Sequence, residues 1–250
     1  MNLTIGWLYP DLMSIYGDRG NIICLQKRCE WRGIAVDMKR LDLDFSAKDL
    51  LACDLLFMGG AQDRQQTIVA EDIKKKKLIL QGMIEKEIPG LYICGAYQFL
   101  GKYYKEADGS IVEGLSIFDL YTENPGEKAK RLIGNVAIKV QNSKFKVQSY
   151  LVGFENHGGR TYLGKNIEPL GEVISGYGNN GKDGYEGAIY KNSIGSYSHG
   201  PILPKNPQLA DWLIQKALEI RYKKKHTLES LDDSLAKKAR DAVLKKLHIS

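Results

Sequence analysis

The order of apolar segments in the first hundred residues limits the fold most strongly. Short segments rich in Leu, Ile and Val alternate with longer segments whose apolar residues recur at helical spacing. Strands that alternate with helices predict a parallel sheet covered by helices on both faces. The predicted strands are LTIGWL (3–8), IAVDMKRL (34–41), DLLFMGG (54–60) and GLYI (90–93), and the predicted helices span about 20–32 and 72–87.

The second half of the chain has a different pattern. From about residue 111 it is glycine-punctuated, tyrosine-rich and β-branched, which predicts antiparallel strands and hairpins beside the parallel core. A helix is predicted over 206–222 and a charged amphipathic helix over 227–250, with Thr227 as its candidate N-cap. We therefore predict a domain over 1–222 and a charged helical extension over 223–250. The antiparallel strands are predicted at 135–141, 146–157, 172–177 and 187–199.

Composition and charge exclude several classes of protein. The 250 residues are 43% hydrophobic and 26% charged, which predicts a soluble globular chain with a real core. No segment reads as a signal peptide or reaches the roughly 20 apolar residues of a membrane span, so a cytoplasmic location is expected. The formal charge of +6 is concentrated in lysine clusters at 74–77 and 221–226. Without an accompanying RNA-binding or zinc-finger motif, these clusters indicate solvated helix faces rather than nucleic-acid binding.

The four cysteines also exclude some chemistry. They form no CxxC pair and have no zinc-type spacing with histidine, so neither a structural metal nor a disulfide framework is expected. The segment GYGNNGKD (176–183) fits G-x-x-x-x-G-K, but Asp183 stands where a phosphate-binding loop needs Ser or Thr. We predict a surface hairpin there, and no ATP site or other cofactor in this chain.

The segment GLYICGAYQFLG (90–101) places one cysteine between an apolar strand and a helix. In such an elbow the nucleophile points outward, and Gly95 and Ala96 are small enough for the tight turn. The N-terminus of the following helix also favours a thiolate. A buried structural cysteine would give the same pattern. Cys94 is therefore a candidate nucleophile.

A cysteine nucleophile needs a base, and the chain has four histidines. Two of them, His226 and His248, lie in the charged tail. We predict that His199, in IGSYSHGP, is held at the carboxyl edge of a strand near the elbow. His157, in GFENHGGRT, is the other remaining histidine, and the alternative for it is a structural or substrate-side role.

Three motifs resemble one family of enzymes. CGAYQFLG (94–101) is similar to the cysteine elbow of class I, triad-type glutamine amidotransferases of the cobyric acid synthase branch, and GFENHGGRT (153–161) and GSYSHG (195–200) resemble its histidine motifs. YGDRGN (16–21) and FMGGAQDRQQ (57–66), without a synthase domain, narrow the resemblance to the GatD family, the glutaminase subunits of lipid II isoglutaminyl synthase. The resemblance implies a flavodoxin-like α/β fold, a mostly parallel sheet flanked by helices with added antiparallel strands and C-terminal helices.

The resemblance also implies roles for single residues. Cys94 attacks the side-chain amide of L-glutamine to give a thioester, and His199 activates the thiol and protonates the departing ammonia. The backbone N–H groups of Gly95 and Gly60 form the oxyanion hole. Arg131 binds the substrate.

One feature of the family is missing. Most class I amidotransferases have a glutamate two residues after the catalytic histidine, where this chain has Pro201. Either the cysteine and histidine act as a dyad, or another carboxylate orients His199. The candidates for that carboxylate are Asp18 and Glu155.

A partner is implied as well, because ammonia released by an isolated glutaminase would be lost to solvent. In the GatD family the partner is a MurT-type, Mur-ligase-like subunit that uses ATP. Together the two subunits amidate the α-carboxyl of D-glutamate in the lipid II stem peptide to D-isoglutamine, in peptidoglycan biosynthesis. The expected location is cytoplasmic, at the inner face of the membrane through the lipid-linked substrate.

Two other functions fit the same residues. The chain could be a stand-alone cysteine amidohydrolase of the same fold, or a non-catalytic binding subunit whose site has lost the glutamate. The presence of both Cys94 and His199 argues against the second function.

Overall fold

A six-stranded sheet forms the centre of the computed structural model, which describes residues 1–15, 17–61, 63–140 and 150–249. The strand order is β13-β14-β4-β3-β1-β2, and every neighbouring pair is parallel except β13 with β14. The predicted mostly parallel α/β sheet is confirmed. Its strands are β1 (Asn2–Leu8), β2 (Ala35–Leu41), β3 (Leu55–Met58), β4 (Gly90–Ile93), β13 (Ala188–Tyr190) and β14 (Ser193–Ser196).

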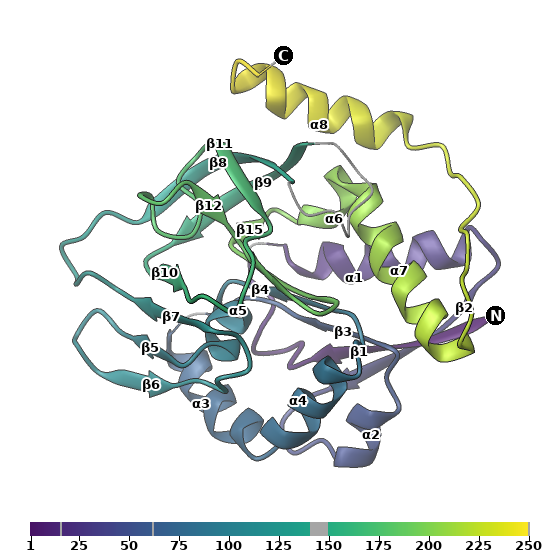
Figure 1. Cartoon of the computed structure of the whole chain (residues 1–250), viewed down its shortest axis with the longest axis horizontal. Coiled ribbons are helices and arrows are strands. Elements are labelled where there is room, and N and C mark those ends of the chain that lie inside the picture. Colours follow the sequence, from purple (N-terminus) through teal and green to yellow (C-terminus); the bar gives the residue numbers. More distant parts are fainter. Residues whose placement is uncertain (16, 62, 141–149, 250) are drawn as a thin grey trace.

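Helices cover both faces of this sheet, with α1, α6 and α7 on one side and α2, α3 and α4 on the other (Figure 1). All residues of β3, β4 and β14 are buried, as expected for parallel strands enclosed by two layers of helices. The helices are α1 (Arg19–Glu30), α2 (Ala47–Leu51), α3 (Asp63–Lys74), α4 (Lys77–Glu85), α5 (Gly95–Leu100), α6 (Ile202–Lys205) and α7 (Pro207–Tyr222).

Strand β14 corrects one prediction. The segment 187–199 was expected to lie in antiparallel hairpins beside the core, but β14 pairs in parallel with β4 and so extends the central sheet. The reason is the sharp reversal after β13, which sends the chain back along β4. This correction matters for the site, because the carboxyl ends of β14 and β4 meet at the same edge of the sheet.

Two smaller sheets lie beside the core. One has the order β10-β7-β5-β6 and the other β12-β11-β8-β9-β15. Most of their pairs are antiparallel, which confirms the predicted hairpins. Positions 141 and 146–149 of two predicted strands lie outside the described residues. The strands are β5 (Tyr103–Lys105), β6 (Ile111–Glu113), β7 (Leu120–Glu123), β8 (Leu132–Lys139), β9 (Tyr150–His157), β10 (Arg160–Leu163), β11 (Gly171–Ser175), β12 (Tyr185–Glu186) and β15 (Ser198–His199).

The predicted single helix over 72–87 is wrong. The chain forms α3 and α4, which are separated at the lysine run. Lys76, at this break, is buried against the ring of Phe45 and forms an ion pair with Asp72. The lysine run is therefore not a uniformly solvated helix face, because one of its members is buried.

The C-terminal segment is less helical than predicted. Helix α8 (Ser234–Lys246) begins seven residues after Thr227, and its N-cap is Asp233. A buried arginine of α1, Arg28, binds both Asp211 of α7 and Asp233, with N–O distances of 2.6 Å to each. Burial disfavours the charged guanidinium, but the two carboxylates outweigh this and raise the pKa of Arg28. These two ion pairs of Arg28 attach the start of α8 to the rest of the protein.

Figure 1 shows α8 along one edge of the molecule, at the end of the extended segment that follows α7. The domain boundary between residues 1–222 and 223–250 stays a prediction.

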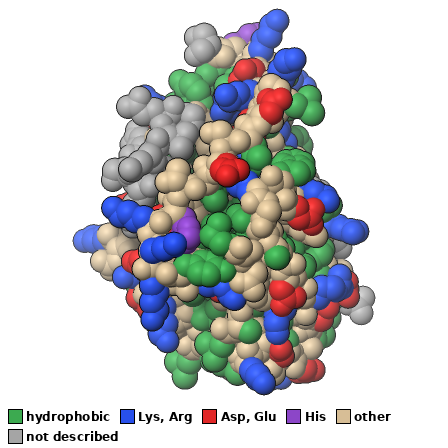
Figure 2. Space-filling model, turned by 90° about the vertical axis from the view of Figure 1, so that its right-hand side faces the viewer, with side chains coloured by type: hydrophobic (Ala, Val, Ile, Leu, Met, Phe, Trp, Pro, Cys, Tyr) green, Lys and Arg blue, Asp and Glu red, His purple; other side chains and the backbone are tan. Residues whose placement is uncertain are grey.

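On the face of the molecule seen in Figure 2, basic and acidic side chains are interspersed. None of the described helices is long and apolar enough to cross a membrane.

Candidate active site

The elbow at Cys94 has an unusual backbone. Cys94 lies between β4 and α5 with φ 54° and ψ −107°, a conformation that costs a non-glycine residue about 1–3 kcal/mol. Two hydrogen bonds hold it: its N–H donates to Ser196 O at 2.8 Å, and its carbonyl accepts from Gln98 N at 3.0 Å. The first bond connects the elbow to the end of β14, so the sheet itself positions the sulfur-bearing residue.

His199 lies next to Cys94, as predicted. It follows β14 in the short strand β15 and is fully buried. Gly60 packs against both side chains: a Cβ placed there would lie 2.9 Å from His199 Cε1 and 3.1 Å from Cys94 Cβ. A side chain at position 60 would therefore crowd both the cysteine and the histidine.

Asp18 is the carboxylate that contacts His199. Its Oδ1 lies 3.1 Å from His199 Nδ1, and both side chains are fully buried. Because a carboxylate only accepts, this contact places a proton on Nδ1 and directs Nε2 elsewhere. The other candidate, Glu155, does not reach His199. Its carboxylate accepts from the backbone N–H groups of Tyr177 and Gly178, at 2.6 and 2.9 Å.

The electrostatics of the site favour a charged histidine. Burial lowers the pKa of His199, but the neighbouring Cys94 and Asp18 raise it by charge and by hydrogen bonding, to about 10. At neutral pH the ring is then an imidazolium. Such a ring beside a cysteine stabilises a thiolate, the reactive form of the nucleophile.

The predicted role of Gly60 in the oxyanion hole is not supported. Its N–H donates to Asp18 Oδ2 at 2.8 Å, so this donor is already used. The sequence could not show the direction of this peptide plane. Gly95 is better placed, because its N–H belongs to the first turn of α5, where backbone N–H groups lack partners within the helix.

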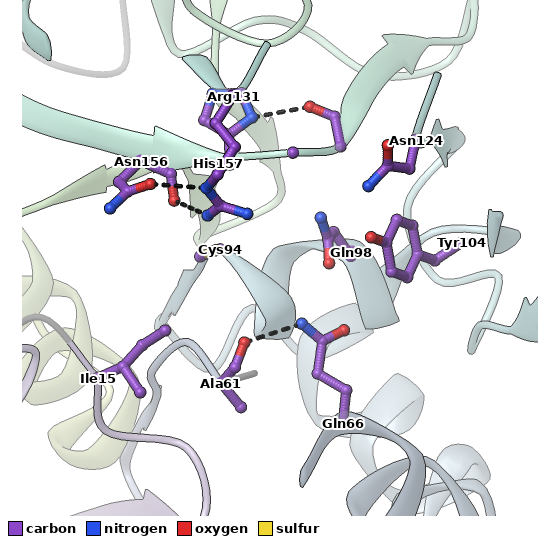
Figure 3. Close-up of a pocket in the computed structure, with 12 residues that line it drawn as sticks. Ile15, Ala61, Gln66, Cys94, Gln98, Tyr104, Asn124, Arg131, Asn156 and His157 are labelled. Atoms are coloured by element: carbon purple, nitrogen blue, oxygen red, sulfur yellow. Dashed lines mark hydrogen bonds between the residues drawn. The ribbon is translucent and has the colours of Figure 1, made fainter. Parts of the chain in front are cut away.

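A cleft with a volume of about 220 Å³ opens in front of Cys94 (Figure 3). Arg131 lies at this cleft, and its role in substrate binding stays a prediction. Its guanidinium donates to Asn156 Oδ1 at 3.0 Å and to Asn156 O at 2.9 Å. The other lining residues are Ile15, Ala61, Gln66, Gln98, Tyr104, Asn124, His157, Gly158 and Gly159.

His157 lines the cleft but is a poor base. Its ring stacks on Tyr197 with centroids 3.7 Å apart, and its Nδ1 lies 2.8 Å from Gly159 O. Burial lowers the pKa of His157 to about 4, so the ring is neutral at pH 7. This position agrees with a structural or substrate-side role.

Sequence reasoning missed several polar groups of the site. Gln66 lies in the quoted segment FMGGAQDRQQ, and Asn156 lies in GFENHGGRT, but neither was singled out. Glu186 was missed entirely. It is buried and accepts from Ser196 Oγ and Tyr197 N at 2.7 and 2.8 Å, and so holds the turn that leads to His199. Within the described ranges, no three His, Cys, Asp or Glu side chains are grouped to hold a metal ion.

Comparison with known proteins identifies the family. Residues 4–207 match the CobB/CobQ-like glutamine amidotransferase domain. The chain belongs to this family. The amidotransferase chain is 45% identical over 217 residues to subunit GatD of lipid II isoglutaminyl synthase (glutamine-hydrolyzing) from Staphylococcus aureus N315, which covers 87% of this chain and 85% of the relative. It is 42% identical over 236 residues to the GatD subunit of Streptococcus pneumoniae R6, with 94% and 87% covered.

Solved structures agree with the fold. The amidotransferase chain superposes on the crystal structure of a glutamine amidotransferase with a TM-score of 0.58, at 15% identity, over 85% of this chain and 98% of the other. A glutamine amidotransferase from Thermotoga maritima gives 0.52 at 17% identity, over 98% and 94%. At these identities the likeness concerns the fold alone.

Replacing Arg131 with alanine tests its predicted role. We expect KM for glutamine to rise about 10- to 100-fold with kcat little changed, because a charge-assisted hydrogen bond to a carboxylate contributes about 1.5–3 kcal/mol. Steady-state glutaminase kinetics measure both constants. Arg40→Ala is the matched control, since Arg40 is half-exposed and pairs with Asp11 away from the cleft. A fall in kcat at unchanged KM would contradict a binding role.

Proposed function

We propose that the chain is the glutaminase subunit of a lipid II isoglutaminyl synthase. The observation that carries the proposal is the juxtaposition of Cys94, on its strained elbow, with the buried His199–Asp18 pair. Sequence identities of 45% and 42% to two GatD subunits, over most of the chain, support the assignment of glutamine hydrolysis for lipid II amidation. The subunit then acts in the cytoplasm, at the inner face of the membrane where its partner meets the lipid-linked acceptor.

The first half of the reaction uses the site as follows. Glutamine enters the cleft, and Arg131 binds its α-carboxylate. The sulfur of Cys94 bonds to the side-chain carbonyl carbon, and the carbonyl electron pair moves onto oxygen beside the Gly95 N–H. The carbon–nitrogen bond then breaks, and the imidazolium of His199 gives its proton to the leaving nitrogen. Ammonia departs and a thioester remains on Cys94.

The second half returns the enzyme to its starting state. Neutral His199 takes a proton from water, the oxygen of which bonds to the thioester carbon. The carbon–sulfur bond breaks, so glutamate leaves and the thiolate–imidazolium pair is restored. Asp18 keeps the ring in one tautomer through both halves, as the carboxylate does in other catalytic triads.

The released ammonia needs an acceptor. We propose that a MurT-type, ATP-using partner subunit binds this acceptor. The partner activates the α-carboxyl of D-glutamate in the lipid II stem peptide and forms D-isoglutamine. ATP binds to that subunit and not to this chain.

Activity assays with and without the partner test this assignment. We expect glutamate release and acceptor amidation to rise together when the purified chain is mixed with a MurT-type subunit, ATP and lipid II. Both products can be measured by mass spectrometry from the same reaction. Fast glutamine hydrolysis that the partner does not change would indicate a stand-alone amidohydrolase. No glutamate release, with amidation only when an ammonium salt is added, would indicate a non-catalytic binding subunit.

A further inference from the structure

The second donor of the oxyanion hole is an open question in this site. A carbonyl oxygen that becomes negative during acyl transfer is stabilised by preorganised donors, commonly two or more. Gly95 supplies one. The predicted second donor, the N–H of Gly60, is held by Asp18 at 2.8 Å. Another group near the elbow must take this position if Asp18 is to keep its bond.

Gln66 is a side chain with a suitable donor. It extends from α3 toward Ala61, below Cys94 in Figure 3, and only 4% of it is exposed. Its Nε2 donates to Ala61 O at 3.0 Å. Because a carbonyl oxygen only accepts, this bond fixes which end of the Gln66 amide is the nitrogen. The second hydrogen of Nε2 has no acceptor among the residues that the structure describes.

The same nitrogen packs against the elbow. A Cβ placed on Gly95 would lie 2.9 Å from Gln66 Nε2, so only a glycine leaves room for the amide. The backbone nitrogen of Gly95 is two bonds, about 2.5 Å, from that Cβ position, so it lies at most about 5.4 Å from Gln66 Nε2. Two N–H donors can serve the same oxygen only when they are no more than about 6 Å apart, twice an ordinary hydrogen-bond length. Gln66 Nε2 and Gly95 N satisfy this condition.

We propose that the side-chain amide of Gln66 is the second oxyanion donor, acting with the backbone N–H of Gly95 on the substrate carbonyl oxygen. The inference rests on the proposed glutaminase function. The hydrogen bond to Ala61 holds the amide in place before the substrate arrives, so little reorganisation is needed when charge develops. This arrangement leaves the Gly60 N–H with Asp18, where it helps to orient the carboxylate that holds His199.

Replacing Gln66 with methionine tests the proposal, because methionine is similar in length and donates no hydrogen bond. We expect kcat for glutamine hydrolysis by the complex to fall about 10²- to 10³-fold, as for loss of one oxyanion donor, with KM nearly unchanged. Gln65→Met is the matched control, since Gln65 is the adjacent residue of α3 and does not line the cleft. Its kcat is expected to equal that of the wild type.

Alkylation of Cys94 by iodoacetamide distinguishes two roles for Gln66: donation of a hydrogen bond to the oxyanion, and positioning of the elbow that carries Cys94. That reaction forms a sulfur–carbon bond as iodide leaves, and no oxyanion develops. We therefore expect Gln66→Met to be alkylated at the wild-type rate. A parallel fall in alkylation would show that Gln66 only holds the elbow, and would overturn the proposal. An unchanged kcat would also overturn it, in favour of a backbone donor in the loop 59–61. If the wild type and Gln65→Met release no glutamate either, the proposed function itself fails.

Discussion

We expect glutamine-driven amidation to be lost when Cys94 is replaced with alanine, while amidation driven by a high concentration of ammonium salt continues. The loss is expected to be about 10⁴-fold or more, the scale seen when a covalent nucleophile is removed. In the proposed complex, ammonium bypasses the glutaminase, because free ammonia would reach the acceptor site of the partner directly. The measurement is isoglutaminyl product formed by the purified pair, with glutamine or ammonium chloride as nitrogen source.

Cys24→Ala is the control for this experiment. Cys24 is a free, half-buried cysteine of α1 that does not line the cleft, and its replacement is expected to leave both reactions intact. Two results would contradict the assignment. Amidation with glutamine by Cys94→Ala would exclude Cys94 as the nucleophile. Loss of the ammonium reaction as well would show that the substitution disrupts the complex.

Asp18→Asn is expected to reduce kcat by about 10²- to 10⁴-fold with little change in KM. The carboxylate of Asp18 accepts from both Gly60 N and His199 Nδ1. An amide has one acceptor oxygen and one NH₂ group, so it cannot satisfy both donors. If its NH₂ faces the ring, Nδ1 becomes the acceptor and the proton moves to Nε2, which can then no longer accept a proton from the thiol.

The pH profile distinguishes this role from a purely structural one. Asp18 is one of the groups that raise the pKa of His199 to about 10. A raised pKa means that the imidazolium, and the stability it contributes, is present at neutral pH and is lost as pH rises through about 10. In the variant this pKa falls. We expect the alkaline limb of kcat/KM to shift to lower pH.

Glu155→Gln is the matched control, because Glu155 was the other candidate and its carboxylate bonds to backbone N–H groups instead. We expect its alkaline limb to coincide with that of the wild type. If Asp18→Asn retains wild-type kcat and the same limb, Cys94 and His199 act as a dyad.

The elbow could be predicted from sequence because its signal is local. An apolar strand, a cysteine, two small residues and a helix follow one another within twelve residues, and Cys94 does occupy the strained joint. The alternation of strands and helices likewise predicted the central sheet. Element boundaries were less accurate, since burial of Lys76 and of β14 depends on neighbours from distant parts of the chain.

The partners of these residues could not be predicted in the same way. Asp18 and His199 are 181 residues apart, and nothing near either position shows which carboxylate faces the ring. The oxyanion hole was a harder case. Whether Gly60 donates to substrate or to Asp18 depends on the direction of one peptide plane, and Gln66 becomes relevant only when α3 and α5 are seen side by side.

The position of β14 has a consequence for biosynthesis. The strand that leads to His199 pairs with β4, about one hundred residues earlier in the chain, and β14 also supplies the carbonyl that holds the elbow. A polypeptide still on the ribosome therefore has neither its base nor a properly held sulfur until residue 199 has been translated and folded against β4. Unfinished chains are expected to be unable to consume glutamine, so amide nitrogen is not wasted on subunits that have no partner to receive it.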